Sequence, residues 1–248
     1  MTDAGGVQAS VQQGGGGGRC GAIERRRQRR WSASGRRSAP PKTRQPPPEV
    51  GVLSFDALAE RVRSLPPRAG STVVVAVDGP AGSGKTTLAG RLAARLDDAP
   101  VLHMDDLYPG WDGLAHAAAA VAAEVLAPLA EGRPARYRRW DWHADRWAGW
   151  VDVPAAPVLV VEGSGSGSTP GAPYLSLLLW VDAPHDLRQA RGFERDGDGF
   201  RPHWSRWARQ EEALFAAERT RERADLRVDT ASPVPHDPAR EVVAESRL

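Results

Sequence analysis

After residue 50, apolar and polar positions alternate with two different periods. Apolar residues at helical spacing predict one helix that begins at Ser54 or Asp56 and ends before Pro66, and a second helix over 86–96. Short apolar runs of strand length separate segments of this kind, and the stretches between the later runs also have helical spacing. The predicted strands are Thr72–Val77, Val101–Met104, Val158–Glu162, Leu177–Asp182 and a weaker Leu226–Asp229.

This order of elements is typical of an α/β protein. Parallel neighbouring strands need crossover connections, and helices supply them on the two faces of the sheet. We therefore predict three layers, with a parallel five-stranded sheet in the middle and helices on both faces. The chain has no repeat of fixed period.

Residues 1–48 differ in composition from the rest of the chain. They carry a net charge of +8, whereas the remaining 200 residues carry −6. The pI near 9.0 therefore comes from this segment, and nucleic-acid binding by the rest is not expected. Runs of Gly, Pro and Arg with few apolar residues predict a disordered basic tail over 1–48 and one folded domain over 49–248. The tail can be interpreted as a basic arm for RNA or anionic surfaces, as a transit peptide, or as a segment without a role.

Several classes of protein are excluded by composition. Cys20 is the single cysteine, which argues against a disulfide scaffold and against cysteine-clustered zinc or iron–sulfur sites. No uncharged apolar stretch reaches the roughly 18 residues that a membrane span needs, and the N-terminal segment has no apolar region typical of a secretory signal. We expect a cytoplasmic protein that does not contact membranes.

A glycine-rich segment joins the strand at 72–77 to the helix at 86–96. Residues 79–86 match the pattern GxxxxGK[ST] in the strand–loop–helix context that this motif requires, which predicts a P-loop NTPase fold. Lys85 is the only lysine after residue 48 in a chain with 31 arginines, as expected where a slim ammonium must enter a tight loop. The predicted ATP-binding residues are Gly79, Pro80, Ala81, Gly82, Ser83, Gly84, Lys85, Thr86 and Thr87.

In this interpretation, backbone amides and Lys85 hold the phosphates of ATP, and the Thr86 hydroxyl ligates Mg²⁺. The alternative is a coincidental glycine turn before a helix. The motif by itself leaves kinases, GTPases, motor ATPases and regulators open, because all of them use the same loop.

Four further blocks between Thr72 and Asp229 resemble the uridine kinase family, which includes nicotinamide riboside kinases. They are His103–Tyr108, Trp140–Trp142, Val160–Gly163 and the segment 181–196. The resemblance implies a kinase with a small lid, in which Asp105 faces the acceptor hydroxyl. It also implies that Tyr108, Asp112, Trp140 and Asp141 belong to the acceptor site.

Two carboxylates in these blocks have a physical interpretation of their own. Asp105 follows a strand end, at the sheet edge where ligands bind in open α/β folds, and could accept the proton of a substrate hydroxyl. A helix cap or solvated turn is its alternative role. Glu162 ends an apolar strand and needs a partner such as Mg²⁺-bound water, a ribose hydroxyl or a buried arginine. We assign it to the metal or the acceptor.

Arg188, Arg191 and Arg195 are spaced to lie on one helical face. Such a stripe would neutralise the charge of a triphosphate when the helix closes over it, with 196–199 as a hinge or lid tip. We therefore add the three arginines to Lys85 and Asp105 as candidate catalytic residues. A solvated helix with acidic neighbours is the alternative.

The acceptor pocket is the least defined part of the resemblance. Four tryptophans within 140–150 could wall a pocket for a flat base or could pack a small cap on the sheet. Asp112 could grip a sugar or form a turn beside Gly113. The sequence departs from the family at His143 and Arg146, which stand closer to the aromatic block, and over 163–169, where Gly, Ser and Thr replace apolar residues.

These observations predict ATP- and Mg²⁺-dependent phosphoryl transfer to a hydroxyl of a small molecule, with a nucleoside as the favoured acceptor. A P-loop NTPase or nucleotide-dependent switch that acts on a protein partner is the alternative. RNA binding through the basic tail is a third hypothesis.

Overall fold

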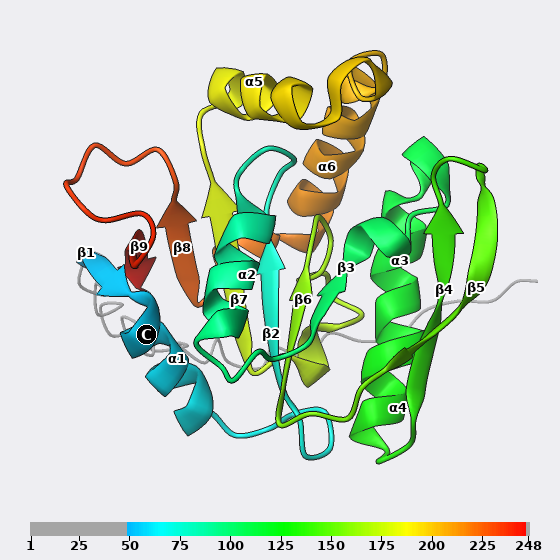
Figure 1. Ribbon diagram of the computed structural model, residues 1–248, viewed down its shortest axis with the longest axis horizontal. Coiled ribbons are helices and arrows are strands. Elements are labelled where there is room, and N and C mark those ends of the chain that lie inside the picture. Colours follow the sequence, from blue (N-terminus) through cyan, green and yellow to red (C-terminus); the bar gives the residue numbers. More distant parts are fainter. Residues whose placement is uncertain (1–48, 247–248) are drawn as a thin grey trace, which may run out of the picture. The chain divides into compact units, whose positions relative to one another are not determined.

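The computed structural model describes residues 49–246, which form a seven-stranded sheet with helices on both faces and a separate two-stranded sheet (Figure 1). The order in the main sheet is β1-β9-β8-β7-β2-β6-β3. The strands are β1 Glu49–Ser54, β2 Val73–Asp78, β3 Val101–His103, β4 Ala135–Asp141, β5 Arg146–Val153, β6 Val158–Glu162, β7 Leu177–Asp182, β8 Leu226–Asp229 and β9 Glu241–Ser246. The prediction of a disordered tail over 1–48 falls outside the described residues.

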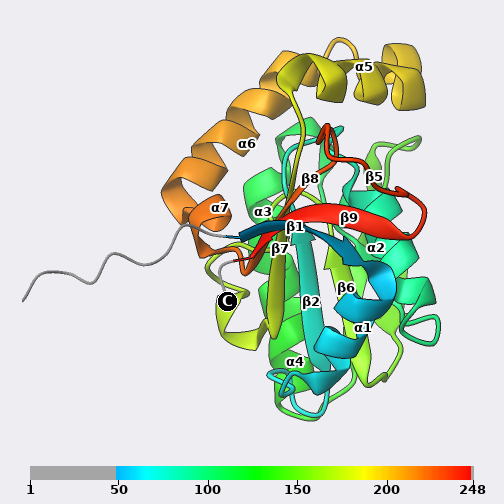
Figure 2. The same cartoon turned by 90° about the vertical axis from the view of Figure 1, so that its left-hand side faces the viewer.

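The prediction of five strands was wrong in number, because two antiparallel strands extend the sheet. The five predicted strands form its parallel part, in the order β8-β7-β2-β6-β3. β9 then pairs antiparallel with β8, and β1 pairs antiparallel with β9 at the edge (Figure 2). β1 and β9 mix polar and apolar residues, which an edge strand tolerates, so they lack the continuous apolar run that marks a central strand.

Helices cover the sheet on both faces, as predicted. The helices are α1 Phe55–Ser64, α2 Lys85–Ala94, α3 Leu114–Ala120, the π-helical η3 Val121–Leu126, α4 Ala127–Ala130, α5 His185–Asp196, α6 Trp204–Glu218 and α7 Thr220–Arg223. Short 3-10 turns are η1 Met104–Asp106, η2 Gly110–Asp112, η4 Ala172–Tyr174 and η5 Gly197–Gly199. Ser54 caps α1 by accepting from the Ala57 amide at 3.1 Å, which resolves the choice between Ser54 and Asp56.

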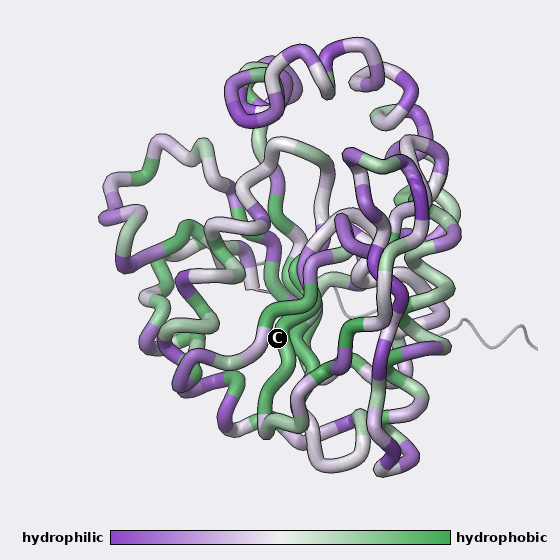
Figure 3. The backbone as a smooth tube through the Cα atoms, turned by 45° about the vertical axis from the view of Figure 1, so that its right-hand side comes forward, coloured by the Kyte–Doolittle hydropathy of each residue, from purple (hydrophilic) through white to green (hydrophobic). Residues whose placement is uncertain are grey.

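The alternating side chains of β2 divide the core into two layers. Val75 and Val77 pack with α1 and α2, whereas Val74 and Ala76 pack with α3, η3 and α6. Trp180 of β7 meets Phe215 of α6 edge-to-face at 4.7 Å. Figure 3 shows the hydrophobic strands at the centre and a hydrophilic α5 above them. Within the described residues, no helix is both long enough and apolar enough to cross a bilayer.

Two connections predicted as helical have other structures. Part of the segment between β3 and β6 forms the β4–β5 hairpin, in which Ala135 and Tyr137 point inward and Arg136 and Arg138 outward. This strand period was obscured by the many arginines and tryptophans. The β6–β7 connection is a Gly/Ser loop with one 3-10 turn, because its residues lack helix-forming side chains. The hairpin and this loop both border the carboxyl ends of the parallel strands.

Candidate nucleotide and acceptor site

The glycine-rich loop runs from the end of β2 to the start of α2. Gly79, Gly82 and Gly84 have φ of +143°, +75° and +98°, where glycine is favoured. A Cβ at Gly79 would lie 2.1 Å from the carbonyl oxygen of Val181, and one at Gly82 would lie 2.1 Å from that of Arg188. The glycines therefore allow the loop to curl tightly against β7 and α5.

Lys85 and Thr86 begin α2, so their backbone amides have no acceptor within the helix and are available to bind an anion at its N-terminus. The Lys85 side chain is buried, and its Nζ donates to the carbonyl oxygen of Pro80 at 3.0 Å. Thr86 Oγ1 donates to the Glu162 carboxylate at 3.2 Å. The glycine-rich loop, the Lys85 ammonium and the Glu162 carboxylate therefore lie close together at the start of α2.

A cavity of about 700 Å³ opens in front of the loop. It lies between the carboxyl ends of the parallel strands, the tip of the β4–β5 hairpin and the end of α5. The residues predicted from the sequence that line it are Ala81, Gly82, Lys85, Thr86, Asp105, Tyr108, Glu162 and Arg195. Residues from four separate segments of the sequence therefore line one cavity.

Asp105 is the second residue of η1, two positions after the end of β3, and its exposed side chain lines this cavity. Partial desolvation by the surrounding protein, together with the nearby Glu162 carboxylate, raises the pKa of Asp105, and the charges of Arg195 and Lys85 partly oppose the shift. The indole of Trp142 donates to the Asp105 backbone carbonyl at 2.9 Å. Asp105 is therefore held at the cavity wall with a carboxylate that is more basic than usual.

Glu162 lies buried at the end of β6, between two polar neighbours. One is the Thr86 hydroxyl, and the other is His103, whose Nδ1 lies 2.6 Å from Glu162 Oε1. The hydrogen bond to Glu162 raises the pKa of His103. Hydroxyl and carboxylate oxygens suit Mg²⁺, which takes few protein ligands and fills its other positions with water and phosphate oxygens. Among residues 49–246, no group of three or more His, Cys, Asp or Glu is placed to hold a metal alone.

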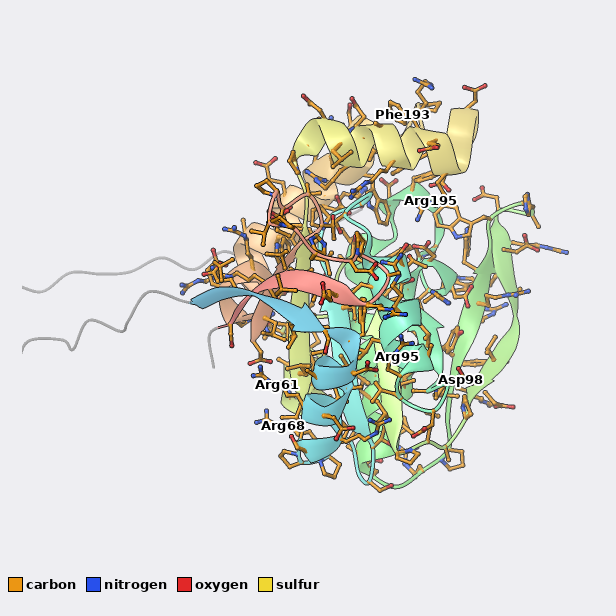
Figure 4. The ribbon with its side chains drawn as sticks, turned by 60° about the vertical axis from the view of Figure 1, so that its left-hand side comes forward. Arg61, Arg68, Arg95, Asp98, Phe193 and Arg195 are labelled. Atoms are coloured by element: carbon orange, nitrogen blue, oxygen red, sulfur yellow. The ribbon has the colours of Figure 1, made fainter. Side chains whose placement is uncertain are left out.

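The three arginines of α5 have different surroundings. Arg195 lines the cavity and lies beneath α5 in Figure 4. Arg188 donates to the carbonyl oxygens of Ala183 and Ala81, at 3.1 and 3.3 Å, and Arg191 donates to Thr230 Oγ1 at 2.9 Å. One arginine thus faces the cavity, and the other two tie α5 to the glycine-rich loop and to the end of β8.

Three residues predicted for the acceptor site lie outside the cavity lining. Asp112 pairs with Arg206, and Trp140 packs edge-to-face on Trp147 at 5.1 Å. Asp141 accepts from the amides of His143 and Ala144, both at 3.0 Å, and so shapes the hairpin turn. The next two residues of the hairpin, Trp142 and His143, reach the cavity in their place.

Several lining residues were not among the site residues assigned from the sequence, although some fall in segments that it singled out, such as the tryptophans within 140–150 and the segment 196–199. They are His103, Trp111, Trp142, His143, Gly163, Ser164, Asp196, Gly199, Phe200 and Trp207. Trp111 stacks on His203 with ring centroids 4.5 Å apart and lies 4.9 Å from Trp142. The crowding of tryptophans was a signal for an aromatic pocket, but the residues that form it come from η2, the hairpin tip and α6.

Asp78, at the end of β2, is fully buried behind the loop. It accepts from the amides of Gly79, Gly165 and Gly167 at 2.7–2.9 Å and so joins the glycine-rich loop to the Gly/Ser loop after β6. Burial raises its pKa to about 6, although the three backbone donors act in the opposite direction. The proton on Asp78 is therefore bound more tightly in the folded protein than in the unfolded chain.

This shift predicts a pH-dependent stability. A raised carboxyl pKa contributes stability below the unfolded value of 3.8, and that contribution is lost as pH rises through about 6. We expect the unfolding free energy of wild type minus that of Asp78→Asn to fall by about 2 kcal/mol between about pH 4.5 and about pH 7. Urea unfolding of both proteins across this range measures it, and a pH-independent difference contradicts it.

Comparison with known proteins gives the class of fold. No family model and none of the curated proteins match the sequence. The structure resembles that of a "possible uridine kinase" from Bacillus stearothermophilus, with a TM-score of 0.52 and 18% identity over 70% of this chain and 96% of the other. A proposed fructose transport system kinase from Silicibacter sp. TM1040 gives a TM-score of 0.45 and 23% identity, over 69% of this chain and 95% of the other. TT1252 from Thermus thermophilus gives a TM-score of 0.38 and 20% identity, over 66% of this chain and 91% of the other.

The likeness to the first of these structures, together with the strand order and the glycine-rich loop, gives the three-layer P-loop type of α/β fold predicted from the sequence, with a larger sheet. At this level of identity the likeness extends to the fold, and the chemistry has to be argued from the site.

Proposed function

We propose that this protein is an ATP- and Mg²⁺-dependent kinase that transfers the γ-phosphoryl group to a hydroxyl of a small molecule, with a nucleoside as the acceptor. The observation that carries the proposal is the shared cavity of Lys85, Thr86 and Asp105. A phosphate loop and a carboxylate of raised pKa in one cavity supply what the transfer needs, a held donor and a group that accepts the hydroxyl proton.

Each group has a role in this reaction. The amides at the start of α2 and the Lys85 ammonium bind the phosphates of ATP. Thr86 and Glu162 would hold Mg²⁺, which would neutralise phosphate charge. Asp105 orients the acceptor hydroxyl and takes its proton. Arg195 stabilises the charge on the transferred group.

The aromatic part of the cavity supports a flat acceptor. Trp111, Trp142 and Phe200 line it, and indole faces bind planar bases by stacking. Trp111 and Phe200 stack on each other, with ring centroids 5.3 Å apart and an interplanar angle of 12°, and so form one aromatic surface at the cavity. A nucleoside combines such a base with the ribose hydroxyl that Asp105 requires.

A substrate panel tests the proposal directly. Release of ADP is measured with Mg·ATP and each of a set of nucleosides and other hydroxyl-bearing small molecules. Stimulation by a nucleoside, with the phosphorylated product identified by mass spectrometry, supports the kinase. A slow ATPase rate that no candidate changes, together with capture of a partner protein, favours a nucleotide-dependent switch.

The metal assignment gives a separate prediction. Glu162→Gln keeps the size of the side chain but removes the charge that attracts Mg²⁺. We expect the concentration of free Mg²⁺ for half-maximal ADP release to rise by about tenfold, which corresponds to about 1.4 kcal/mol. The control is Glu60→Gln on the exposed face of α1. If wild type, Glu162→Gln and Glu60→Gln all require the same Mg²⁺ concentration, Glu162 is not a ligand of the metal.

A further inference from the structure

A buried carboxylate behind the glycine-rich loop has no place in the proposed chemistry. Glu211 of α6 is 3% exposed. Its Oε1 accepts from the Ala81 amide at 2.8 Å, from Ser164 Oγ at 2.7 Å and from Trp207 Nε1 at 2.8 Å. Burial raises the pKa of this carboxyl, and Lys85 opposes the shift. One oxygen atom thus joins the loop, the segment after β6 and a wall of the cavity.

Ala81 is held from both sides, by α5 and by α6, the two helices that flank η5. Its amide donates to Glu211 of α6, and its carbonyl oxygen accepts from Arg188 of α5 at 3.3 Å. The turn between these helices includes η5, where Gly197 has a φ of +58°. A displacement of α5 or α6 would therefore change the hydrogen bonds of the Ala81 backbone amide and carbonyl oxygen.

The direction of the Ala81 amide affects phosphate binding. This amide is committed to Glu211, and the Ser83 amide donates to the Pro80 carbonyl oxygen at 3.2 Å, so the loop is fixed at two points before Lys85. A loop fixed in this way loses less conformational freedom when phosphate binds. Without the anchor, ordering the loop becomes part of the cost of nucleotide binding.

We propose that Glu211 is a positioning residue that fixes the glycine-rich loop in its phosphate-binding conformation and links it to the acceptor wall at Trp207. This inference rests on the proposed function, since it assumes that the loop binds a nucleotide. Trp207 contacts Tyr108 edge-to-face at 4.8 Å, and the Tyr108 hydroxyl donates to the Ser164 carbonyl oxygen at 2.8 Å. The same network therefore runs from the donor loop to the aromatic side of the cavity.

The test is the affinity for Mg·AMP-PNP, measured by titration calorimetry on the full chain. Glu211→Ala is expected to weaken binding by about tenfold, because a hydrogen bond to a charged group is lost from the loop. Glu211→Gln retains the Oε1 acceptor and is expected to bind within about threefold of wild type. Glu212→Ala, an exposed neighbour on α6, is the matched control and is expected to bind like wild type.

Steady-state kinetics separate positioning from a general loss of structure. The KM for ATP is expected to rise in Glu211→Ala by the same factor as the dissociation constant, whereas kcat at saturating ATP stays within about threefold of wild type. If Glu211→Ala does not fold, Glu211→Asp replaces it, since the shorter side chain withdraws the oxygen from Ala81 and is expected to show the same loss.

Wild-type affinity in Glu211→Ala or Glu211→Asp overturns the inference, and so does equal weakening in Glu211→Gln and Glu211→Ala. These outcomes leave the proposed function intact. If wild type itself binds no Mg·AMP-PNP, both proposals fail. If wild type binds it but phosphorylates no acceptor, the kinase proposal fails and the positioning of the loop by Glu211 stands on the affinities.

Discussion

Replacing Lys85 by Ala is expected to lower kcat/KM for ADP formation by at least about 10³-fold. The ammonium is the one lysine among residues 49–246, and it is enclosed by the loop next to Asp105 and Thr86. Loss of one preorganised group that stabilises transition-state charge costs about 10²–10³-fold, and Lys85 also binds the ground-state phosphates. A coupled assay of ADP release with the acceptor found by the panel measures the effect.

The fold is expected to survive this change, because the side chain of Lys85 is bonded within its own loop, to the Pro80 carbonyl oxygen. The control is Arg68→Ala, which also removes one cation but lies at the opposite end of the protein from Arg195 (Figure 4). Circular dichroism spectra and thermal midpoints close to those of wild type accompany the expected loss. An unchanged rate in Lys85→Ala contradicts the assignment of the loop as an ATP site.

The parts of this protein that sequence reasoning predicts are those that local constraints define. β2 and β6 are buried on both faces, so they read as continuous apolar runs and were placed within a residue of their ends. The glycine-rich loop needs glycines at close backbone contacts, which makes its spacing informative. Glu162 ends β6 and Asp105 follows β3 by two residues, and the topology brings the carboxyl ends of these parallel strands to one edge of the sheet.

Contacts between distant segments were beyond this reasoning. Glu211 and Glu212 are adjacent acidic residues of one helix, and nothing local shows that the first is buried against Ala81 while the second is exposed. The common helical face of α5 likewise did not show that Arg195 alone lines the cavity. β1 finds its partner only in β9, near the other end of the chain.

The aromatic block illustrates a limit of another kind. Of the block Trp140–Trp142, the resemblance assigned Trp140 and Asp141 to the acceptor site, but the turn of the hairpin brings Trp142 and His143 to the cavity. Side chains of a strand point alternately to its two faces. The register shift between Arg138 and Trp140 changes which residues of β4 lie opposite which residues of β5, and so interrupts this alternation. A bulge of this kind depends on the pairing of two strands, which a motif match does not include.

Asp105→Asn is expected to lower kcat by about 10²–10⁴-fold, the range for loss of a positioned general base. Asn has the same shape but cannot take the proton of the acceptor hydroxyl. Because the walls of the cavity and Glu162 raise the pKa of Asp105, the acidic limb of the wild-type kcat/KM profile is expected above the usual range of an aspartate. Rates measured from about pH 4 to about pH 9 give both results.

The neighbouring Asp106 supplies the control. Its carboxylate accepts from the Tyr137 hydroxyl at 3.0 Å, which ties η1 to the hairpin and leaves Asp106 outside the cavity lining. Asp106→Asn keeps an acceptor for Tyr137, so its kcat is expected within about fivefold of wild type. Affinity for Mg·AMP-PNP should be similar in both variants, because neither residue contacts the loop amides. A large loss in Asp106→Asn with a small one in Asp105→Asn would mean that the second carboxylate, rather than the first, receives the proton.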